Sequence, residues 1–433
     1  MTDLRSQVAA RMRTLERSEA MSLAQIHAGQ FALLRALVAH HAAHSPHFAR
    51  RLAGVGLSPA DLGTPDGLAK LPPLSRRQIQ TATDLFSTPP AGHGATSPRS
   101  TSGSTGEPVR ILRTALNQVD WLAVTMRDHR WNRRDFAGRF AAFRARVEAP
   151  RRMRDWGLPA ALFHRTGPAI AVRNTLPIDT QLDLLRDFAP TTMLAYPAGL
   201  AGLIDRLEAL GERIGGIADV RTVGAVVSPD LRARCLRWLG APIADTYSSE
   251  EMGYVALQCP ESGLYHVMAE TMLVEVVDDD GGPTPPGRTG RLLLTDLRNY
   301  ATPMIRYEIG DHAEPGPPCP CGRGLPTLVR IAGRERNLMS YPDGSRGWPY
   351  LGRIRHRDVG GVIQYRYEQV AADRMAVTLV VEAPLDDAAE DRLRAEIVRG
   401  LGFPFAIDFS YSDRRLEPGP NGKFEEFINR TLT

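Results

Sequence analysis

The pattern of apolar and polar positions changes character along the chain. Over residues 1–60, apolar residues such as Leu23, Ile26, Leu34 and Leu37 recur at helical spacing and predict helices. Between residues 109 and 246, short apolar runs alternate with longer amphipathic stretches. This alternation predicts parallel strands joined by helical crossovers, which is an α/β fold with helices flanking a sheet.

Individual elements in this part of the chain can be placed from the same pattern. We expect strands at 109–112, 140–147, 172–176, 193–195, 220–227 and 243–246, and helices at 76–85, 117–129, 180–188, 200–210 and 231–239. Ligands of parallel sheets bind beyond the carboxyl ends of the strands. The loop at 247–253, which follows the last of these strands, is therefore a candidate binding loop.

The pattern becomes that of an antiparallel sheet after residue 270. Strands are predicted at 271–277 and 291–295, joined by the turn sequence D-D-D-G-G-P, with a third strand at 304–307. These strands predict a small barrel-like subdomain at about 270–332.

The last hundred residues have their own order of elements. It reads as strand 361–370, strand 375–381, helix 386–399 and strand 406–411. We expect two domains, 1–334 and a mobile α+β domain at 335–433, with a hinge at 334–337.

Composition and charge favour a globular protein over a membrane protein or a nucleic-acid-binding protein. Hydrophobic residues make up 43% and charged residues 24% of 433 residues, as is usual for a globular protein. No apolar run approaches the ~18 residues of a membrane span, and the start M-T-D-L-R-S has no apolar signal core. The net charge is +4 and the arginines are scattered. We expect a cytoplasmic protein without a membrane or nucleic-acid partner.

The use of lysine is a sharp compositional feature. Of 53 basic Lys and Arg residues, only Lys70 and Lys423 are lysine. A lysine is a compact point charge on a flexible stem, suited to reaching a single oxygen. Lys70 precedes L-P-P and carries no motif, whereas Lys423 lies in the loop sequence P-G-P-N-G-K-F. Lys423 is therefore a candidate functional cation.

The stretch at 99–110 reads R-S-T-S-G-S-T-G-E-P-V-R and offers a cradle for phosphate. Glycine permits positive φ angles, so successive N–H groups can point to one centre, and the hydroxyls add donors. The alternative interpretation is a flexible surface turn. No lysine follows the second glycine, so this is not a phosphate loop of the GxxxxGK[ST] type.

Three further polar clusters fall on predicted loops. They read D-T-Y-S-S-E-E-M-G at 245–253, T-P-M-I-R-Y-E-I-G-D at 302–311 and I-A-G-R-E-R-N-L at 331–338. Together with the Ser/Gly stretch they supply an aromatic face for a base, a carboxylate for Mg²⁺, an acid for ribose hydroxyls and cations. These groups indicate nucleotide chemistry.

In this order and at these intervals, the motifs resemble those of the adenylate-forming superfamily. T-S-G-S-T-G-E-P is similar to its phosphate loop, Y-S-S-E to its Tyr-x-[Ser/Thr]-Glu motif, I-R-Y-E-I-G-D to its ribose motif, G-R to its hinge motif and N-G-K-F to its lysine motif. T-D-L-R-N-Y-A-T-P-M-I-R-Y-E-I-G-D and C-P-C-G-R-G-L-P are similar to signatures of the phenylacetate–CoA ligase and capsular-biosynthesis branch. The resemblance runs from about residue 72 to the end of the sequence.

The resemblance implies the two catalytic residues and the nucleotide contacts. Lys423 would bridge the substrate carboxylate and the α-phosphate, and Glu250 would hold Mg²⁺. The other implied nucleotide-binding residues are Ser102, Gly103, Ser104, Thr105 and Gly106 for the β,γ-phosphates, Gly224, Ala225 and Val226 for adenine, Tyr247 for stacking on adenine, Ser249 for phosphate, Asp311 for ribose and Arg334 near the hinge.

Substrate contacts rest on the fold analogy, and the motifs show departures. The substrate pocket is expected to include Tyr196, Val227, Met252 and Gly253. The chain has Val109-Arg110 where the family often has lysine, and its adenine segment G-A-V-V-S-P lacks the usual acidic residue. Asn337 stands where the hinge motif often carries aspartate.

Four functional hypotheses follow. The first is an AMP-forming ligase that uses ATP and Mg²⁺ to activate a carboxylic acid, releases pyrophosphate and transfers the acyl group to a thiol such as CoA. The resemblance favours an aryl or small hydrophobic acid. In the second hypothesis the acceptor is an amine or a carrier protein, and in the third another oxyanion such as nitrite is activated in a biosynthetic pathway. The fourth is a nucleotide-binding protein without catalysis. The acid, the acceptor and a homodimeric state stay open.

The cysteines suggest a metal centre. Cys319 and Cys321 form a C-P-C turn, and Cys259 lies seven residues before His266, which gives a Cys₃His set suited to structural zinc. Cys-x-Cys is an unusual zinc spacing, and free thiols in a proline-rich turn are the alternative. Cys235 lies in a helical pattern and is expected in the core.

Overall fold

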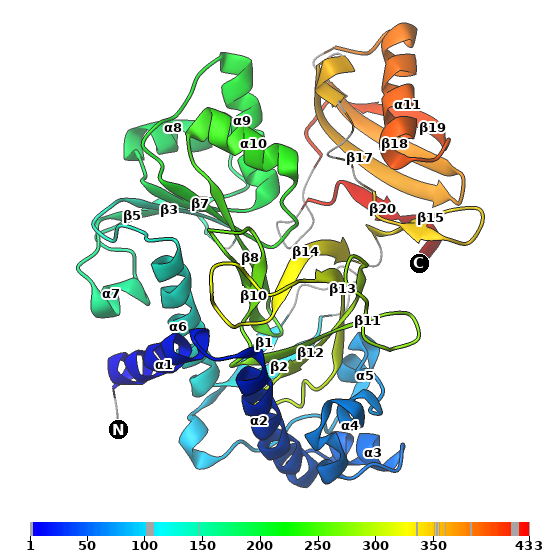
Figure 1. Cartoon of the computed structure of the whole chain (residues 1–433). Helices are drawn as coiled ribbons and strands as arrows, with labels where there is room; N and C mark the ends of the chain where they lie inside the picture. Colours follow the sequence, from blue (N-terminus) through cyan, green and yellow to red (C-terminus); the bar gives the residue numbers. More distant parts are fainter. Residues whose placement is uncertain are drawn as a thin grey trace.

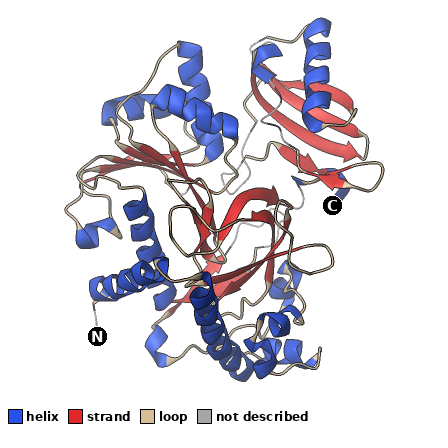
Figure 2. Cartoon of the chain, in the orientation of Figure 1, coloured by secondary structure: helices blue, strands red, loops and turns tan. Residues whose placement is uncertain are grey.

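A twelve-stranded mixed sheet runs through the centre of the molecule (Figures 1 and 2). Its strand order is β11-β12-β13-β14-β10-β9-β8-β7-β6-β3-β5-β4. The computed structural model describes residues 3–100, 108–145, 147–334, 337–349, 351, 354, 356–359, 361–381, 383–416 and 424–432. The α/β architecture predicted from the sequence is confirmed.

One half of this sheet is parallel and is sandwiched between helices. Its parallel strands are β3 (Phe140–Arg144), β5 (Ala169–Arg173), β6 (Thr192–Ala195), β7 (Asp219–Val223) and β8 (Ile243–Ser249), with β4 (Arg151–Met153) antiparallel at the edge. Helices α8 (Ile178–Phe188), α9 (Pro197–Leu210) and α10 (Pro229–Leu239) pack on one face, and α6 (Ala115–Trp131) lies on the other (Figure 1). The predicted alternation of strands and helices is confirmed. Three strands end earlier than expected, since β3, β5 and β7 end at Arg144, Arg173 and Val223. The strand expected at 109–112 is a correction: it forms at Arg110–Thr114 but pairs antiparallel with Thr96–Ser100 in a separate two-stranded sheet.

The other half of the sheet is antiparallel and continues from β8 without a break. It consists of β9 (Gly253–Gln258), β10 (Tyr265–Val267), β14 (Thr327–Arg334), β13 (Tyr307–Pro315), β12 (Gly290–Asp296) and β11 (Met272–Val277). The β11–β12 hairpin predicted at the D-D-D-G-G-P turn is confirmed. The sequence pattern gave no indication of β9, β10 and β14.

The bounds predicted for the strand at 304–307 are wrong, because β13 begins only at Tyr307 and runs to Pro315. Arg306 has φ = 52° and is buried, with its guanidinium donating to the carbonyls of Ala69 and Leu71 and pairing with Glu275. A positive φ at a residue other than glycine interrupts extended backbone. Arg306 thus joins the sheet to the N-terminal helices.

The first 81 residues are largely helical, as predicted for residues 1–60. It contains α1 (Leu4–Glu19), α2 (Leu23–His44), α3 (Pro46–Ala53), α4 (Pro65–Ala69) and the short α5 (Arg76–Thr81). Helix α1 packs against α6, where the buried Arg127 of α6 pairs with Glu19 at 3.1 Å and with Glu270 at 2.6 Å. The strands β1 (Thr96–Ser100) and β2 (Arg110–Thr114) form an antiparallel pair in which Ser100 faces Arg110. This pairing holds together the two ends of the Ser/Gly segment.

The C-terminal part forms a second sheet with its own core, orange to red in Figure 1. Strands β17 (Val362–Ala371), β18 (Arg374–Val381) and β19 (Ala406–Ser412) and helix α11 (Asp387–Leu401) confirm the predicted order of elements. Strand β20 (Phe427–Asn429) was not predicted and pairs parallel to β17. The domain boundary at 334/335 and the mobility of this part stay predictions.

Short elements complete the described chain. They are α7 (Ala160–Phe163), β15 (Met339–Ser340), β16 (Arg346–Gly347) and the 3₁₀ helices η1 (Pro59–Gly63), η2 (Ala91–His93), η5 (His356–Val359) and η6 (Arg430–Leu432). None of the helices in the described ranges has the length and apolar composition needed to span a bilayer.

Candidate active site

Three residues from three separate motifs meet at the carboxyl end of β8. The hydroxyl of Tyr247, on β8, donates a hydrogen bond of 2.7 Å to Oδ2 of Asp311 on β13. Arg334, the last residue of β14, faces Asp311 in the strand register and places its Nε 3.4 Å from Oδ1. The structure therefore brings together the Tyr-x-Ser-Glu, ribose and hinge motifs.

This contact requires the sheet to curl. Strands β8 and β13 are separated by β9, β10 and β14 in the sheet order. At ~4.8 Å per strand spacing, a flat sheet would put β8 and β13 roughly 19 Å apart, too far for a Tyr and an Asp side chain to touch. The antiparallel half therefore wraps round towards β8, which gives the barrel-like curvature expected for this part of the chain.

Burial and charge fix the protonation states of Tyr247 and Arg334. Burial raises the pKa of Tyr247 well above its ordinary value, and Asp311 raises it further, so the phenol stays neutral and donates its proton. Burial alone would lower the pKa of Arg334, but the carboxylates of Asp311 and Glu251 raise it on balance. Arg334 is thus a permanent cation beside Asp311.

The structure adds Glu251 and Arg76 to the cluster, which the motifs did not indicate. Glu251 is only 7% exposed, and its Oε1 lies 3.5 Å from Nη1 of Arg76 at the start of α5. Neighbouring Glu250, which the resemblance assigns to Mg²⁺, is exposed at the turn after β8. The N-cap pattern Ser75-x-x-Gln78 marks the start of α5, but nothing local shows that α5 reaches a residue 175 positions away.

The other predicted nucleotide contacts are placed as follows. Ser249 accepts a 2.9 Å hydrogen bond from the backbone N–H of Met252 and so shapes the turn that carries Glu250. Gly224 follows β7 with φ = 88°, and Ala225 and Val226 beside it are exposed. Six of the predicted site residues lie outside the described ranges: Ser102, Gly103, Ser104, Thr105, Gly106 and Lys423.

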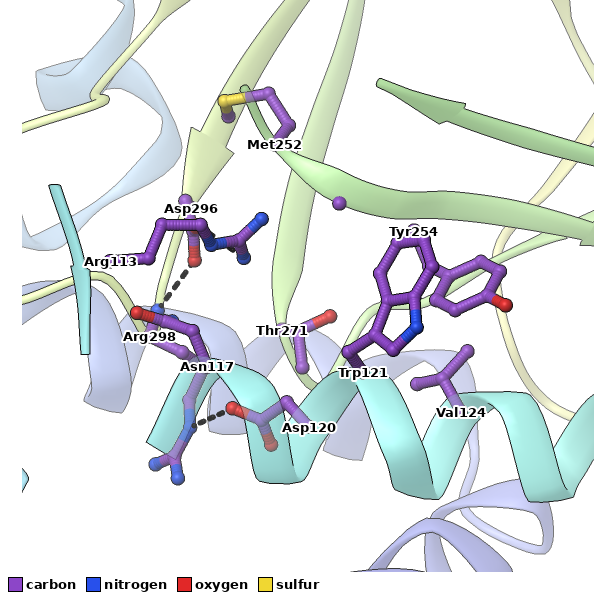
Figure 3. Close-up of a pocket in the computed structure, with 11 residues that line it drawn as sticks. Arg113, Asn117, Asp120, Trp121, Val124, Met252, Tyr254, Thr271, Asp296 and Arg298 are labelled. Atoms are coloured by element: carbon purple, nitrogen blue, oxygen red, sulfur yellow. Dashed lines mark hydrogen bonds and ion pairs between the residues drawn. The ribbon is translucent and has the colours of Figure 1, made fainter. Parts of the chain in front are cut away.

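Two of the predicted substrate residues, Met252 and Gly253, line a pocket between α6 and the start of β9 (Figure 3). It encloses about 300 Å³ of empty space, part of which is open to solvent. Trp121 of α6 stacks on Tyr254 with ring centroids 4.2 Å apart. Gly253 has φ = 79°, a backbone conformation that favours glycine, and a Cβ there would lie 2.9 Å from Nη1 of Arg113.

Charged residues line the floor of this pocket in two pairs. Arg113 lies 3.4 Å from Asp296, and Arg298 lies 3.2 Å from Asp120. Burial raises the pKa of Asp296 to about 6. The pocket is therefore polar at one end and aromatic at the other.

The remaining two substrate candidates differ in accessibility. Tyr196 follows β6 and is half-buried. Val227 is only 8% exposed and packs in the hydrophobic core with Leu231 of α10. Contact with a ligand stays a prediction for both residues, and Val227 offers little surface for one.

The four predicted zinc ligands converge at the far end of the antiparallel strands. Cys259 follows β9, His266 is on β10, and Cys319 and Cys321 are in the turn between β13 and β14. Their ligand atoms all lie within 4.8 Å of one another, with 3.8 Å between Sγ of Cys319 and Cys259 and 3.3 Å between Sγ of Cys321 and Nε2 of His266. Cys235 is buried in the core, as predicted.

The chain is similar in sequence to several phenylacetate–coenzyme A ligases. The Escherichia coli (strain K12) protein is 27% identical over 340 residues, which cover 75% of each chain. The Aromatoleum evansii protein is 25% identical over 334 residues, covering 75% of this chain and 74% of the relative. The Pseudomonas putida protein is 27% identical over 342 residues, covering 75% and 74%. No protein-family model matches the chain.

Solved structures show the same fold. A 2-hydroxyisobutyryl-CoA ligase in the postadenylation state, in complex with 2-HIB-AMP, superposes with a TM-score of 0.77 at 18% identity, covering 96% of this chain and 92% of that one. The anthranilate CoA ligase AuaEII in complex with anthranoyl-AMP gives 0.55 at 13% identity, covering 76% and 65%. The chain therefore has the fold of these CoA ligases. Its sequence is similar to that of phenylacetate–coenzyme A ligases, so the resemblance drawn from the motifs is confirmed.

Proposed function

We propose that the protein is an AMP-forming ligase that activates a carboxylic acid with ATP and transfers the acyl group to CoA. The observation that supports it best is the contact of Tyr247 and Arg334 with Asp311, because it joins three nucleotide motifs at one edge of the sheet. The sequence relatives, which are phenylacetate–coenzyme A ligases, point to the same chemistry.

Asp311 is suited to the ribose. A carboxylate offers about four lone-pair sites, and Tyr247 and Arg334 occupy one on each oxygen. The remaining sites can accept hydrogen bonds from ribose hydroxyls. Because the Tyr247 hydroxyl is engaged and the residue is only 9% exposed, the structure favours a positioning role for Tyr247 toward Asp311. Stacking of its ring on adenine stays a prediction.

The phosphates would be held from two sides. The Ser/Gly motif lies in the sequence between Ser100 and Arg110, which pair with each other across β1 and β2. Glu250, exposed at the turn after β8, would hold Mg²⁺. Attack of a carboxylate on the α-phosphate brings two anions together, so Mg²⁺ and the ammonium of Lys423 would stabilise the transition state.

A screen of acids for pyrophosphate release tests this function. Purified protein would be incubated with ATP, Mg²⁺ and each acid, with and without CoA, and AMP and thioester would be quantified by chromatography. We expect acid-dependent pyrophosphate release, with AMP appearing in solution when CoA is added. Release of AMP with an amine or a carrier protein but not with CoA would favour the other acceptors. No release with any acid would contradict adenylation of carboxylates.

A second proposal concerns the Cys₃His cluster, which we assign to a structural zinc ion. Tetrahedral zinc with Zn–S bonds of about 2.3 Å separates two sulfur ligands by about 3.8 Å. The Cys259–Cys319 sulfur distance is 3.8 Å, and all four ligand atoms fit one coordination sphere. Four protein ligands leave no open position for a substrate. The ion would tie the β9–β10 turn to the β13–β14 turn.

A further inference from the structure

The strand register places Arg144 at the carboxyl ends of the parallel strands. Ala142 of β3 pairs with Leu194 of β6, and Leu194 pairs with Arg221 of β7. Two residues further on, Arg144 at the end of β3 and Tyr196, the extended residue just after β6, occupy the next row beside Val223. This row lies at the carboxyl ends of the strands, where ligands of parallel sheets bind.

Arg144 and Tyr196 belong to the face of the sheet that α6 covers. Phe143 and Ala195, which alternate with them, pack in the core with α8, α9 and α10 on the opposite face. Arg221, one row below, confirms which face this is. Its Nε lies 3.2 Å from Oδ2 of Asp128 on α6, and its guanidinium donates to the hydroxyl of Tyr254.

Arg144 differs from its neighbour Arg221 in the carboxylates that pair with it. Arg221 and Arg134 are both compensated by Asp128, and Arg134 also pairs with Asp219. In contrast, none of the carboxylates in the described ranges pairs with Arg144.

Arg144 is nevertheless placed where a ligand could reach it. Its side chain is solvent-accessible, yet enough protein surrounds it that burial lowers its pKa, and Arg221 lowers it further against the opposing effect of Tyr196 and Tyr254. A partly desolvated cation without a carboxylate is costly unless an anion arrives to pair with it.

We propose that Arg144 binds a second carboxylate of the acid substrate, so that the enzyme activates one end of a dicarboxylic acid and holds the other end. This inference rests on the proposed acid–CoA ligase function. A guanidinium pairs with a carboxylate through two parallel hydrogen bonds, and the hydroxyl of Tyr196 is placed to add a third. A purely hydrophobic or unsubstituted aryl acid would leave Arg144 without a partner.

Matched acids and three variants test the proposal. Acid-dependent pyrophosphate release would be measured with mono- and dicarboxylic acids of equal chain length, and with phenylacetate and its ring-carboxylated derivative. The enzymes would be the wild type, Arg144→Met, Arg144→Lys and the control Arg392→Met, a substitution on the exposed face of α11.

We expect wild-type kcat/KM to favour the dicarboxylic member of each pair by about tenfold or more, the contribution typical of a charge-assisted hydrogen bond. Arg144→Met should remove this preference, because kcat/KM should fall more for the dicarboxylic acids than for the monocarboxylic acids. Arg144→Lys should retain part of the preference, and Arg392→Met all of it.

Two results would overturn the assignment of Arg144 and leave acid activation intact. One is a wild-type preference for monocarboxylic acids. The other is an equal loss with both kinds of acid in Arg144→Met, which would place Arg144 at the reacting carboxylate or the phosphate. Absence of pyrophosphate release from the wild type with any acid would instead refute the proposed function itself. The wild-type preference is measured without any variant, so a variant that fails to fold does not remove the test.

Discussion

The hydroxyl of Tyr247 donates a 2.7 Å hydrogen bond to the carboxylate of Asp311, 64 residues further along the chain. Both residues are at most 9% exposed, so the bond is shielded from water. It forms only because the antiparallel half of the sheet curls back towards β8. The position of the proposed ribose ligand therefore depends on the curvature of the whole sheet.

Tyr247→Phe removes this bond and leaves the Asp311 carboxylate with one donor fewer. We expect the KM for ATP to rise about tenfold, because hydrogen bonds to charged groups contribute about 1.5–3 kcal/mol. Steady-state kinetics at saturating acid would measure it. Tyr265→Phe is a matched control, since Tyr265 donates a similar buried bond of 2.8 Å to Asp245. An equal rise in KM for both variants would contradict a specific role for Tyr247.

Lys423→Ala is expected to abolish adenylation while ATP still binds, because Mg²⁺ would be left without the ammonium that helps it to offset the charge developing on the α-phosphate. Pyrophosphate release would report the chemistry, and equilibrium dialysis would report ATP binding. The chain supplies its own control in Lys70→Ala, which changes the other lysine at an exposed position after α4. Full activity of the Lys423 variant would refute the assignment.

Purified protein should contain about one equivalent of zinc, measured by inductively coupled plasma mass spectrometry. Cys319→Ser should lower the zinc content and the melting temperature, since a structural metal contributes folding free energy. Cys235→Ala removes a buried cysteine outside the cluster and should keep the zinc. Less than a tenth of an equivalent in the wild type would rule out the metal centre.

His41 should make the protein sensitive to mild acid. Its Nε2 lies 3.0 Å from the Asn299 carbonyl, so Nε2 carries the hydrogen, and Nδ1 accepts from the Ser87 hydroxyl at 2.7 Å. Burial lowers the pKa of His41 to about 3. The folded state thus resists a proton that the unfolded state takes up below about pH 6.5. Stability is full above pH 6.5 and falls as the pH drops towards 3.

His41→Gln should remove this contribution. Between pH 7.5 and 5, the decrease in unfolding free energy should be smaller in the variant by about 2 kcal/mol, which corresponds to 1.5 pH units below the unfolded pKa. Urea unfolding at both pH values would measure the difference. An unchanged decrease would show that other groups control the acid sensitivity.

Local patterns predicted the parallel half of the fold well. Helices such as 180–188 and strands such as 193–195 are encoded by their own periodicity, and the structure has them at nearly these bounds. Strand β10 has three residues and β20 has three, too short for a periodic signal. Arg306 reads as part of a strand, whereas in the structure it has a positive φ and long-range bonds to Ala69, Leu71 and Glu275 that the local pattern does not indicate.

The residues of the candidate site were likewise predictable only where a local pattern marks them. Tyr247, Asp311 and Arg334 could be found because each lies in a motif with its own spacing. Glu251 was overlooked although it adjoins Glu250, because the sequence does not show which of two successive carboxylates turns inward. Arg144 lies in no recognised motif. Its position beside Tyr196 follows only from the register of β3 against β6.

Side-chain amides of Asn337 and Asn429 connect the segment that follows the hinge motif to strand β20. The Asn337 side-chain amide donates to the carbonyl of Phe427, and the Asn429 amide donates to the carbonyl of Leu338. Lys423 lies four residues before β20 in sequence. An aspartate at 337 would have no N–H to donate at neutral pH, so asparagine is the residue that can make this bond. The two bonds couple residues 337 and 338 to β20, so that a displacement of one of these segments would displace the other as well.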